Sequence, residues 1–314
     1  MALTLDQANS VSKRIFDETL VQTAYDNSPF WVRMKQENKI TKHFGTSIQW
    51  PLEYKQADLS AAVDPSDQVD FRTVDTITGL VLAMKFYRAK NLITWQEQAE
   101  NSGEAKIVDL LKAKAKTMQR ALYHNFATDL YTTNTSGKGI ASLVDIIDSA
   151  TTYGGVAVAD ASTWASWEDA STTALTLYGA GSLSYYQNLA TFGTEGPKFH
   201  VTTKNLYTKF MSLFEGQKVY QDNRLADAGF DNIKFMGSPI TADAYCPASY
   251  WYGLDIGALE FCVHPNYNFK LTDWFKLEQA GHPESMARVI SFAGNLKCTN
   301  RRTSFKLSTL NYQL

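Results

Sequence analysis

One long amphipathic helix is the feature of this sequence that most restricts its fold. From Asn101 onward, apolar residues recur at steps of three and four along one stripe. The stripe comprises Ile107, Leu111, Ala115, Met118, Leu122 and Phe126. Asn101 and Glu104 have the spacing of a capping box, which marks the start of a helix. A helix of about 28 residues is roughly 40 Å long. We therefore expect a structural spine.

Two β-rich runs precede this helix, SIQWPLEY at 47–54 and TGLVLAMKFYR at 78–88. The segment between them is acidic, with a single arginine as counter-charge. Its charged residues are Asp58, Asp64, Asp67, Asp70, Arg72 and Asp75. The pattern predicts a long β-hairpin with a polar tip, which has little core of its own and needs a partner surface. The aspartates lack the dense spacing of a calcium loop, so we expect them to be solvated or to face a partner.

The charge balance argues against tight binding to nucleic acid. The net charge is −2, whereas proteins that neutralise many phosphates carry a basic surplus. A basic face does run along the predicted spine, interrupted by Glu104 and Asp109. It is formed by Lys106, Lys112, Lys114, Lys116 and Arg120. Such a face is usually solvated or paired with a neighbouring subunit; the alternative is a weak DNA contact without sequence preference.

No motif for enzymatic chemistry stands out. The histidines, His43, His124, His200, His264 and His282, have no metal-ligand spacing. The cysteines, Cys246, Cys262 and Cys298, form no CxxC pair, and we expect reduced thiols. No phosphate-binding glycine loop and no nucleophile elbow is present. We therefore predict neither a cofactor nor a metal. The sequence also lacks a signal-peptide pattern and any run of ~18 apolar residues, so we expect no membrane partner.

Three later phrases carry a family resemblance. They are KGIASLVDIIDS at 138–149, FHVTTKNLYTKFMSLFE at 199–215 and YWYGLDIGALEFCVHPNYNFKLTDW at 250–274. In their order and spacing, after a hairpin and a spine helix, they resemble the major capsid proteins of tailed bacteriophages. That family has the Hong Kong 97-like fold, an α+β architecture. The resemblance covers nearly the whole chain from about residue 40.

The resemblance implies a domain plan. Residues 1–45 would form an N-terminal arm, 46–90 an extended β-hairpin loop, 91–132 a peripheral domain with the spine helix, 133–262 an interleaved axial domain, and 263–314 a return to the strands of the peripheral domain. It also implies a function, which is assembly into hexamers and pentamers of an icosahedral shell around double-stranded DNA. Such a subunit is not an enzyme, resides in the virion and is assembled in the host cytoplasm.

The partners implied are other copies of the chain, with scaffold, portal or decoration proteins as further candidates, and the packaged DNA through a non-specific contact. Aromatic residues make up 13% of the chain and are enriched in protein interfaces, so Trp31, Trp50 and Trp95 are candidate inter-subunit contacts. The charged loop residues Lys55, Asp58, Asp64, Asp67, Asp70 and Arg72 are further candidates. Some family members crosslink a loop lysine to an asparagine. Here Lys55 with Asn266 or Asn268 and Glu278 could do so, although a solvated Lys55 is the simpler interpretation.

Two other readings stay open. An encapsulin-type nanocompartment would share the fold but enclose a cargo enzyme instead of DNA. An α/β enzyme would need titratable groups that converge in a pocket, which the sequence alone does not reveal. A tail or decoration protein fits the long spine helix poorly.

Overall fold

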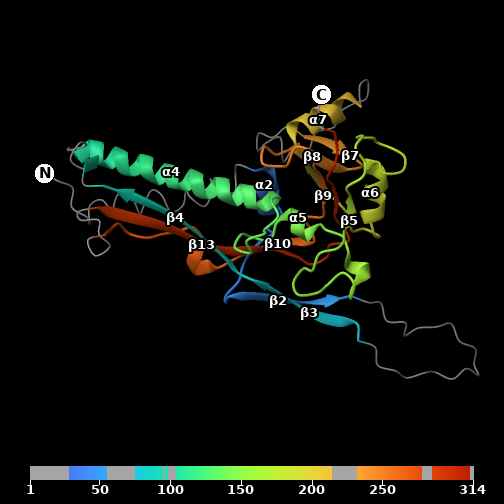
Figure 1. The fold of residues 1–314 in the computed structure, drawn as a ribbon, viewed down its shortest axis with the longest axis horizontal. Helices are drawn as coiled ribbons and strands as arrows, with labels where there is room; N and C mark the ends of the chain where they lie inside the picture. The colour runs from blue at the N-terminus through green and yellow to red at the C-terminus, as the bar shows by residue number, and fades with distance from the viewer. Residues whose placement is uncertain are drawn as a thin grey trace, which may run out of the picture.

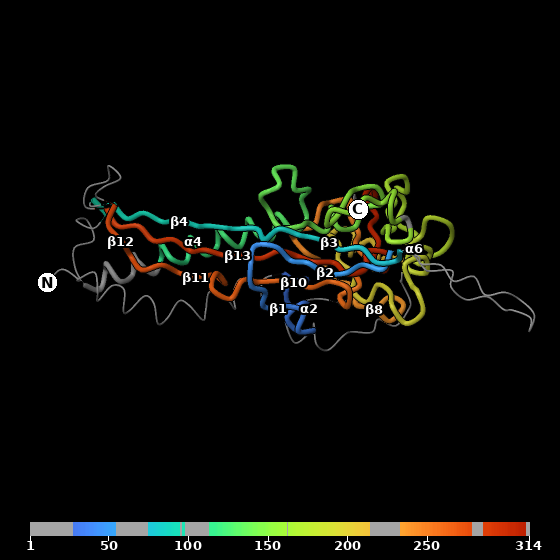
Figure 2. The backbone as a smooth tube through the Cα atoms, turned by 90° about the horizontal axis from the view of Figure 1, so that it is seen from below, coloured from blue at the N-terminus to red at the C-terminus, as the bar shows by residue number. Residues whose placement is uncertain are grey.

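The computed structural model describes residues 28–54, 75–94, 96–97, 104–213, 232–277 and 285–311. The described chain has mixed α+β structure, with a long helix beside one sheet and a second sheet at the far end (Figure 1). Seen from below, the chain is elongated, and β4 and β13 run along its length (Figure 2). The helices are α2 (Pro29–Gln36), α4 (Glu104–Tyr131), α5 (Leu143–Ile146), α6 (Leu183–Ala190) and α7 (Lys204–Ser212), with short 3-10 turns η1 (Ser162–Trp164) and η2 (Pro265–Tyr267).

The predicted spine is confirmed as α4, which spans 28 residues. Where side chains are described, the predicted stripe is the buried face of the helix. Ala115, Met118, Leu122 and Phe126 are each at most 5% exposed. Burial of this stripe against a sheet, more than helix propensity, stabilises a helix of this length.

One large sheet is built around β13 (Met286–Cys298), and we call it the peripheral sheet. The antiparallel strand β4 (Lys85–Ile93) pairs along one side of β13. Along the other side lie β10 (Leu259–Val263), β11 (Lys270–Leu271) and β12 (Phe275–Lys276), and β1 (Ile40–Lys42) runs parallel to β10. Helix α4 covers one face, where the Phe126 ring lies 5.3 Å from the Phe292 ring and 5.8 Å from the Tyr87 ring.

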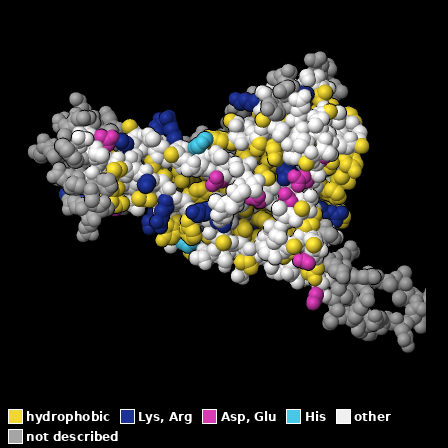
Figure 3. Space-filling view, viewed as in Figure 1, with side chains coloured by type: hydrophobic (Ala, Val, Ile, Leu, Met, Phe, Trp, Pro, Cys, Tyr) yellow, Lys and Arg dark blue, Asp and Glu magenta, His cyan; other side chains and the backbone are white. Residues whose placement is uncertain are grey.

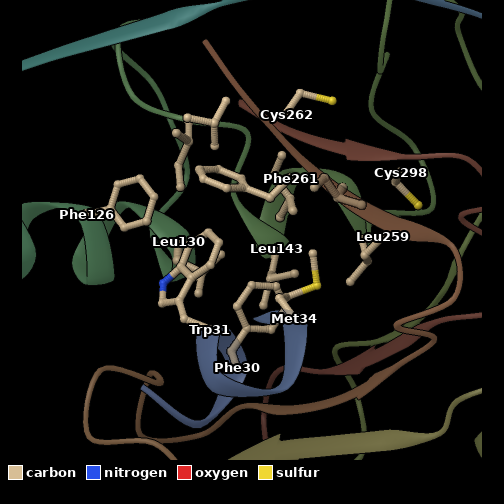
Figure 4. Close-up of a cluster of buried hydrophobic side chains, with 14 of the residues drawn as sticks. Phe30, Trp31, Met34, Phe126, Leu130, Leu143, Leu259, Phe261, Cys262 and Cys298 are labelled. Carbon is tan, nitrogen blue, oxygen red and sulfur yellow. The ribbon is translucent and has the colours of Figure 1, made fainter. Parts of the chain in front are cut away.

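Helix α2 closes the core under the end of α4. Trp31 is fully buried, and its ring stacks on Phe126 with centroids 4.7 Å apart. Figure 4 shows Phe30 and Met34 of the same helix turned toward Leu143 and Leu259. Ser28-Pro29 begins this helix, because proline suits the first helical position, which needs no amide hydrogen bond.

The second large sheet, which we call the axial sheet, has the strand order β5-β14-β9-β6-β8-β7. Its strands are β5 (Trp167–Asp169), β6 (Phe199–Thr202), β7 (Asn232–Phe235), β8 (Ser238–Ala242), β9 (Trp251–Leu254) and β14 (Phe305–Leu307). A second buried cluster, which includes Phe210, Trp251 and Phe305, lies between this sheet and helices α6 and α7. The expectation that residues 263–314 all return to the peripheral domain is wrong for β14. This strand pairs with β9 and β5, because its side chains complete the axial core.

The predicted hairpin is confirmed in its stem. Strands β2 (Ser47–Glu53) and β3 (Ile77–Ala83) pair antiparallel from Ser47↔Ala83 to Glu53↔Ile77. One face of the stem is buried, with Trp50 opposite Leu80. The expected acidic tip, 55–74, lies outside the described residues.

Candidate inter-subunit surfaces

The face of the peripheral sheet that is turned away from α4 carries a row of aromatic rings. Side chains alternate along a strand, so Phe86 and Tyr87 point to opposite faces of β4, and Tyr87 faces α4. Phe86 is paired with Ala293 on β13, and His264 donates its backbone N–H to Ala293 on the other side of that strand. Phe44 packs edge-on against the His264 ring, with centroids 6.2 Å apart.

This row is exposed to an unusual degree. Phe44 is 73% exposed, Phe86 60% and Tyr267 44%, and the Tyr267 ring lies 5.3 Å from the ring of His264. Scattered single hydrophobic side chains on a surface need no explanation, but Phe44 and Tyr267 both pack on His264, and such a group is typical of an interaction site.

A row of positive charge lies beside the aromatic rings. In the sheet register, Arg88 on β4 and Lys270 on β11 flank Ser291 on β13, so all three side chains share one face. Lys90 follows two positions after Arg88 on that face. We call the surface formed by Phe44, Phe86, Arg88, His264, Tyr267 and Lys270 the peripheral face. Figure 3 shows Lys and Arg side chains gathered over the limb that carries α4, β4 and β13.

The outer face of the β2–β3 stem carries the opposite charge, and its exposed hydrophobic side chains are aliphatic. Ile77 is 66% exposed and Val81 50% exposed, while Leu80 between them is buried. Glu53, opposite Ile77, and Asp75 add negative charge. We call Glu53, Asp75, Ile77 and Val81 the hairpin face. Figure 3 shows acidic side chains where the described hairpin ends.

The base of the hairpin is fixed to the rest of the subunit. Trp50 packs near Tyr153, and the Lys297 ammonium lies 5.5 Å from the Trp50 ring. Thr163 donates its hydroxyl to the carbonyl of Tyr54 over 2.7 Å. These contacts set the direction in which the stem leaves the body. A groove of about 430 Å³ lies alongside, where the Arg302 guanidinium covers the Phe192 ring at 5.3 Å.

The structure corrects two of the predicted contact residues. Trp31 is 0% exposed and Trp50 is 7% exposed, so both anchor the core of the subunit instead of an inter-subunit surface. Lys55, Asp58, Asp64, Asp67, Asp70, Arg72 and Trp95 lie outside the described residues. Of the proposed crosslinking partners, Asn266 is exposed, Asn268 is half-buried, and Glu278 is outside the described residues.

Sequence reasoning missed the exposed aromatic row and the Ile77–Val81 pair. The alternation of Phe86, Arg88 and Lys90 with Tyr87 and Ala89 was a usable signal for a strand with one polar, accessible face.

The three described cysteines are buried. Burial raises the pKa of Cys246, Cys262 and Cys298, which keeps these thiols protonated and weakly reactive. Among the described residues, no three His, Cys, Asp or Glu side chains converge as metal ligands, and no helix is long and apolar enough to cross a membrane.

The sequence and the fold of this chain give different results when each is compared with known proteins. No protein-family model and no curated protein sequence matches this chain. Solved structures do match. A chain of the cyanophage A-1(L) capsid asymmetric unit is similar with a TM-score of 0.65 at 17% identity, over 87% of this chain and 90% of that one. The chain has the fold of a phage capsid protein.

Two further structures mark the range of proteins that share this fold. A Mycobacterium phage Adephagia chain is similar with a TM-score of 0.55 at 10% identity, over 94% of this chain and 91% of that one. The SrpI encapsulin from Synechococcus elongatus PCC 7942 has a TM-score of 0.57 at 10% identity, over 90% of this chain and 89% of that one. Phage capsids and an encapsulin shell therefore share this architecture, and the fold alone does not separate them.

Proposed function

We propose that this chain is the major capsid protein of a tailed bacteriophage, with the Hong Kong 97-like fold. The capsid fold across most of the chain is the observation that carries the proposal. Copies of the subunit would form the hexamers and pentamers of an icosahedral shell around double-stranded DNA. The role is structural and not enzymatic, without a cofactor. The protein would be assembled in the host cytoplasm and reside in the virion, with scaffold, portal or decoration proteins as additional partners.

We propose the domain plan that the resemblance implies, with one change. Residues 1–45 would form the N-terminal arm, 46–90 the extended loop with the start of β4, and 91–132 the peripheral domain with α4. The axial domain comprises most of 133–258 together with β14. Strands β10 to β13 complete the peripheral domain. The two domains are interleaved because the chain crosses between the sheets after β9 and again before β14.

Complementary surfaces at two separate places on the subunit support assembly by head-to-tail contacts. The hairpin face is aliphatic and acidic, whereas the peripheral face is aromatic and basic. None of the side chains of Glu53, Asp75, Arg88 and Lys270 has a charged partner among the described residues. A contact between two different patches is heterologous, and such contacts close into rings when the rotation between copies permits. We propose that the hairpin face of one copy packs on the peripheral face of the next.

A charge exchange tests this contact. Glu53→Lys with Asp75→Lys reverses the hairpin face, and Arg88→Glu with Lys270→Glu reverses the peripheral face. Either pair alone should abolish assembly at low ionic strength, as followed by light scattering. All four changes in one chain should restore it in part, because opposite charges again face each other.

The matched control is Lys204→Glu with Lys234→Glu, which reverses two exposed charges of the axial domain. This variant should assemble normally. Assembly of the single-face variants at the parent's rate would contradict the proposed contact. If the variant with all four changes folds but does not assemble, the two faces do not meet each other.

An encapsulin-type shell is the alternative, supported by the similarity to SrpI. The content of particles purified from the native source decides between the two. Double-stranded DNA supports the capsid, and a folded cargo protein supports the nanocompartment.

A further inference from the structure

The solvent-facing side of α4 is a second basic surface, and it differs from the peripheral face in composition. Its exposed residues between 113 and 125 are Ala113, Lys116, Thr117, Arg120, Ala121, His124 and Asn125. No large hydrophobic side chain is among them. Protein–protein interfaces have an apolar, aromatic-rich centre, which the peripheral face offers and this side of α4 lacks.

Two cationic side chains on this side lie in a line. Lys116 and Arg120 are four residues apart, and the exposed His124 follows at the same interval. Four residues correspond to about 6 Å along a helix axis, and the whole of α4 to about 42 Å. Lys116 and Arg120 therefore present two cationic groups about one helical turn apart, on the solvent-facing side of a helix that is about as long as one turn of B-form DNA, about 34–36 Å.

Folding alone does not favour this arrangement. Like charges four residues apart on a helix repel each other and cost about 0.2–0.5 kcal/mol per pair. Lys114, one position off the line, is paired with Glu97 at 2.7 Å. Neither Lys116 nor Arg120 has an acidic or hydrogen-bonded side-chain partner among the described residues. Among the described residues, Lys116 and Arg120 are thus without counter-charges.

We infer that this line on α4, with Lys116 and Arg120 at its centre, contacts the phosphates of double-stranded nucleic acid without reading bases. The inference rests on the proposed function, since a shell subunit meets the enclosed genome with one of its surfaces. Two or three phosphate contacts per subunit are individually weak. Repetition over a closed shell multiplies them, and the net charge of −2 keeps each subunit from binding tightly alone.

Binding of the full-length, unassembled protein to a mixed-sequence 30-base-pair DNA duplex tests the inference. Fluorescence anisotropy would be recorded between 50 and 200 mM salt for the parent and for Lys116→Gln with Arg120→Gln. The slope of log Kd against log salt should fall by about 2 in the variant, because each lost phosphate contact removes about 0.9. Two control variants also replace two basic residues by glutamine. They are Lys204→Gln with Lys234→Gln, and Arg88→Gln with Lys270→Gln. Neither should lower the slope.

Light-scattering assembly of the same variants separates this inference from the proposed function. A smaller slope of log Kd against log salt in the α4 variant, together with normal shell assembly, supports the α4 contact. Normal shells from the parent and the α4 variant, with no salt-dependent DNA binding by the parent, would overturn the inference and leave the capsid role intact. Loss of assembly in the α4 variant with unchanged DNA binding would overturn it too, since this side of α4 would then bind a second copy. No shells from the parent would count against the proposed function itself.

Discussion

Tyr131, the last residue of α4, donates a hydrogen bond from its hydroxyl to Oδ2 of Asp243 over 3.0 Å. Ser28, just before α2, donates to the same oxygen, and the backbone N–H of Tyr245 donates to Oδ1. Asp243 is 2% exposed and directly follows β8. One buried carboxylate therefore joins the entrance of α2, the end of the spine and the axial sheet.

Removal of one donor from this group should destabilise the subunit. Tyr131→Phe leaves the buried carboxylate with two donors in place of three. A hydrogen bond to a charged group contributes about 1.5–3 kcal/mol, so we expect a loss of about that size in the free energy of unfolding. Urea unfolding measures it. The control is Tyr178→Phe, because the Tyr178 side chain is 76% exposed and should tolerate the change. Equal stability of the two variants would show that the carboxylate does not depend on this bond.

Arg301 holds a loop to the axial domain from a fully buried position. Its guanidinium donates to the carbonyls of Ile146, Asp148 and Thr151, and it lies 5.0 Å from the Trp164 ring. Arg301→Lys keeps the charge but lacks the planar fork that reaches three acceptors. We expect a loss of about 3 kcal/mol, since the buried carbonyl of Ile146 and the partly buried hydrogen bonds to Asp148 and Thr151 lose their donors.

Thermal unfolding by circular dichroism checks the Arg301 prediction. The adjacent Arg302→Lys serves as the control, because Arg302 is only partly buried and its described contact is the Phe192 ring. A midpoint for Arg301→Lys within the error of that control would contradict the role given to the three bonds.

His200 gives the fold a dependence on pH. Burial lowers the pKa of this imidazole to about 3, and its Nδ1 accepts a hydrogen bond from Trp251. The unfolded chain binds a proton near the ordinary histidine pKa of about 6.5. The stabilisation that the neutral imidazole of His200 contributes is therefore fully present above about pH 6.5. It falls by about 1.4 kcal/mol per pH unit between there and the folded pKa.

Urea unfolding of the parent and of His200→Gln at pH 7, 5.5 and 4.5 tests this dependence. Glutamine retains an acceptor for Trp251 but does not titrate, so the variant should lose less stability on acidification than the parent does. His124→Gln, at an exposed position, should follow the parent. Parallel stability curves for the parent and His200→Gln would rule out the proposed contribution of His200.

The parts of the fold that depend on local pattern could be predicted from the sequence. The stripe from Ala115 to Phe126 identified α4, and the two β-rich runs identified the hairpin stem. Burial of Trp31 and Trp50 could not be predicted, because their partners Phe126 and Tyr153 come from distant segments. Periodicity reveals that a side chain is apolar but not whether its partner surface belongs to the same copy.

The candidate site was harder to foresee for the same reason. The row from Phe86 to His264 exists only because β4, β13 and the end of β10 are aligned in one sheet register. Strand β14 is three residues long, and its assignment to the axial sheet depends on the fit of Phe305 into a core formed mainly by earlier segments.

Cryo-electron microscopy of the purified, recombinant full-length protein tests the central claim most directly. The account predicts closed icosahedral shells, or sheets and tubes of hexamers, in which density for Ile77 and Val81 of one copy lies against Phe44 and Phe86 of the next. A homogeneous 35.1 kDa monomer at every protein and salt concentration would contradict it. Particles that leave both of these surfaces open to solvent would retain the shell but refute the contact proposed to build it.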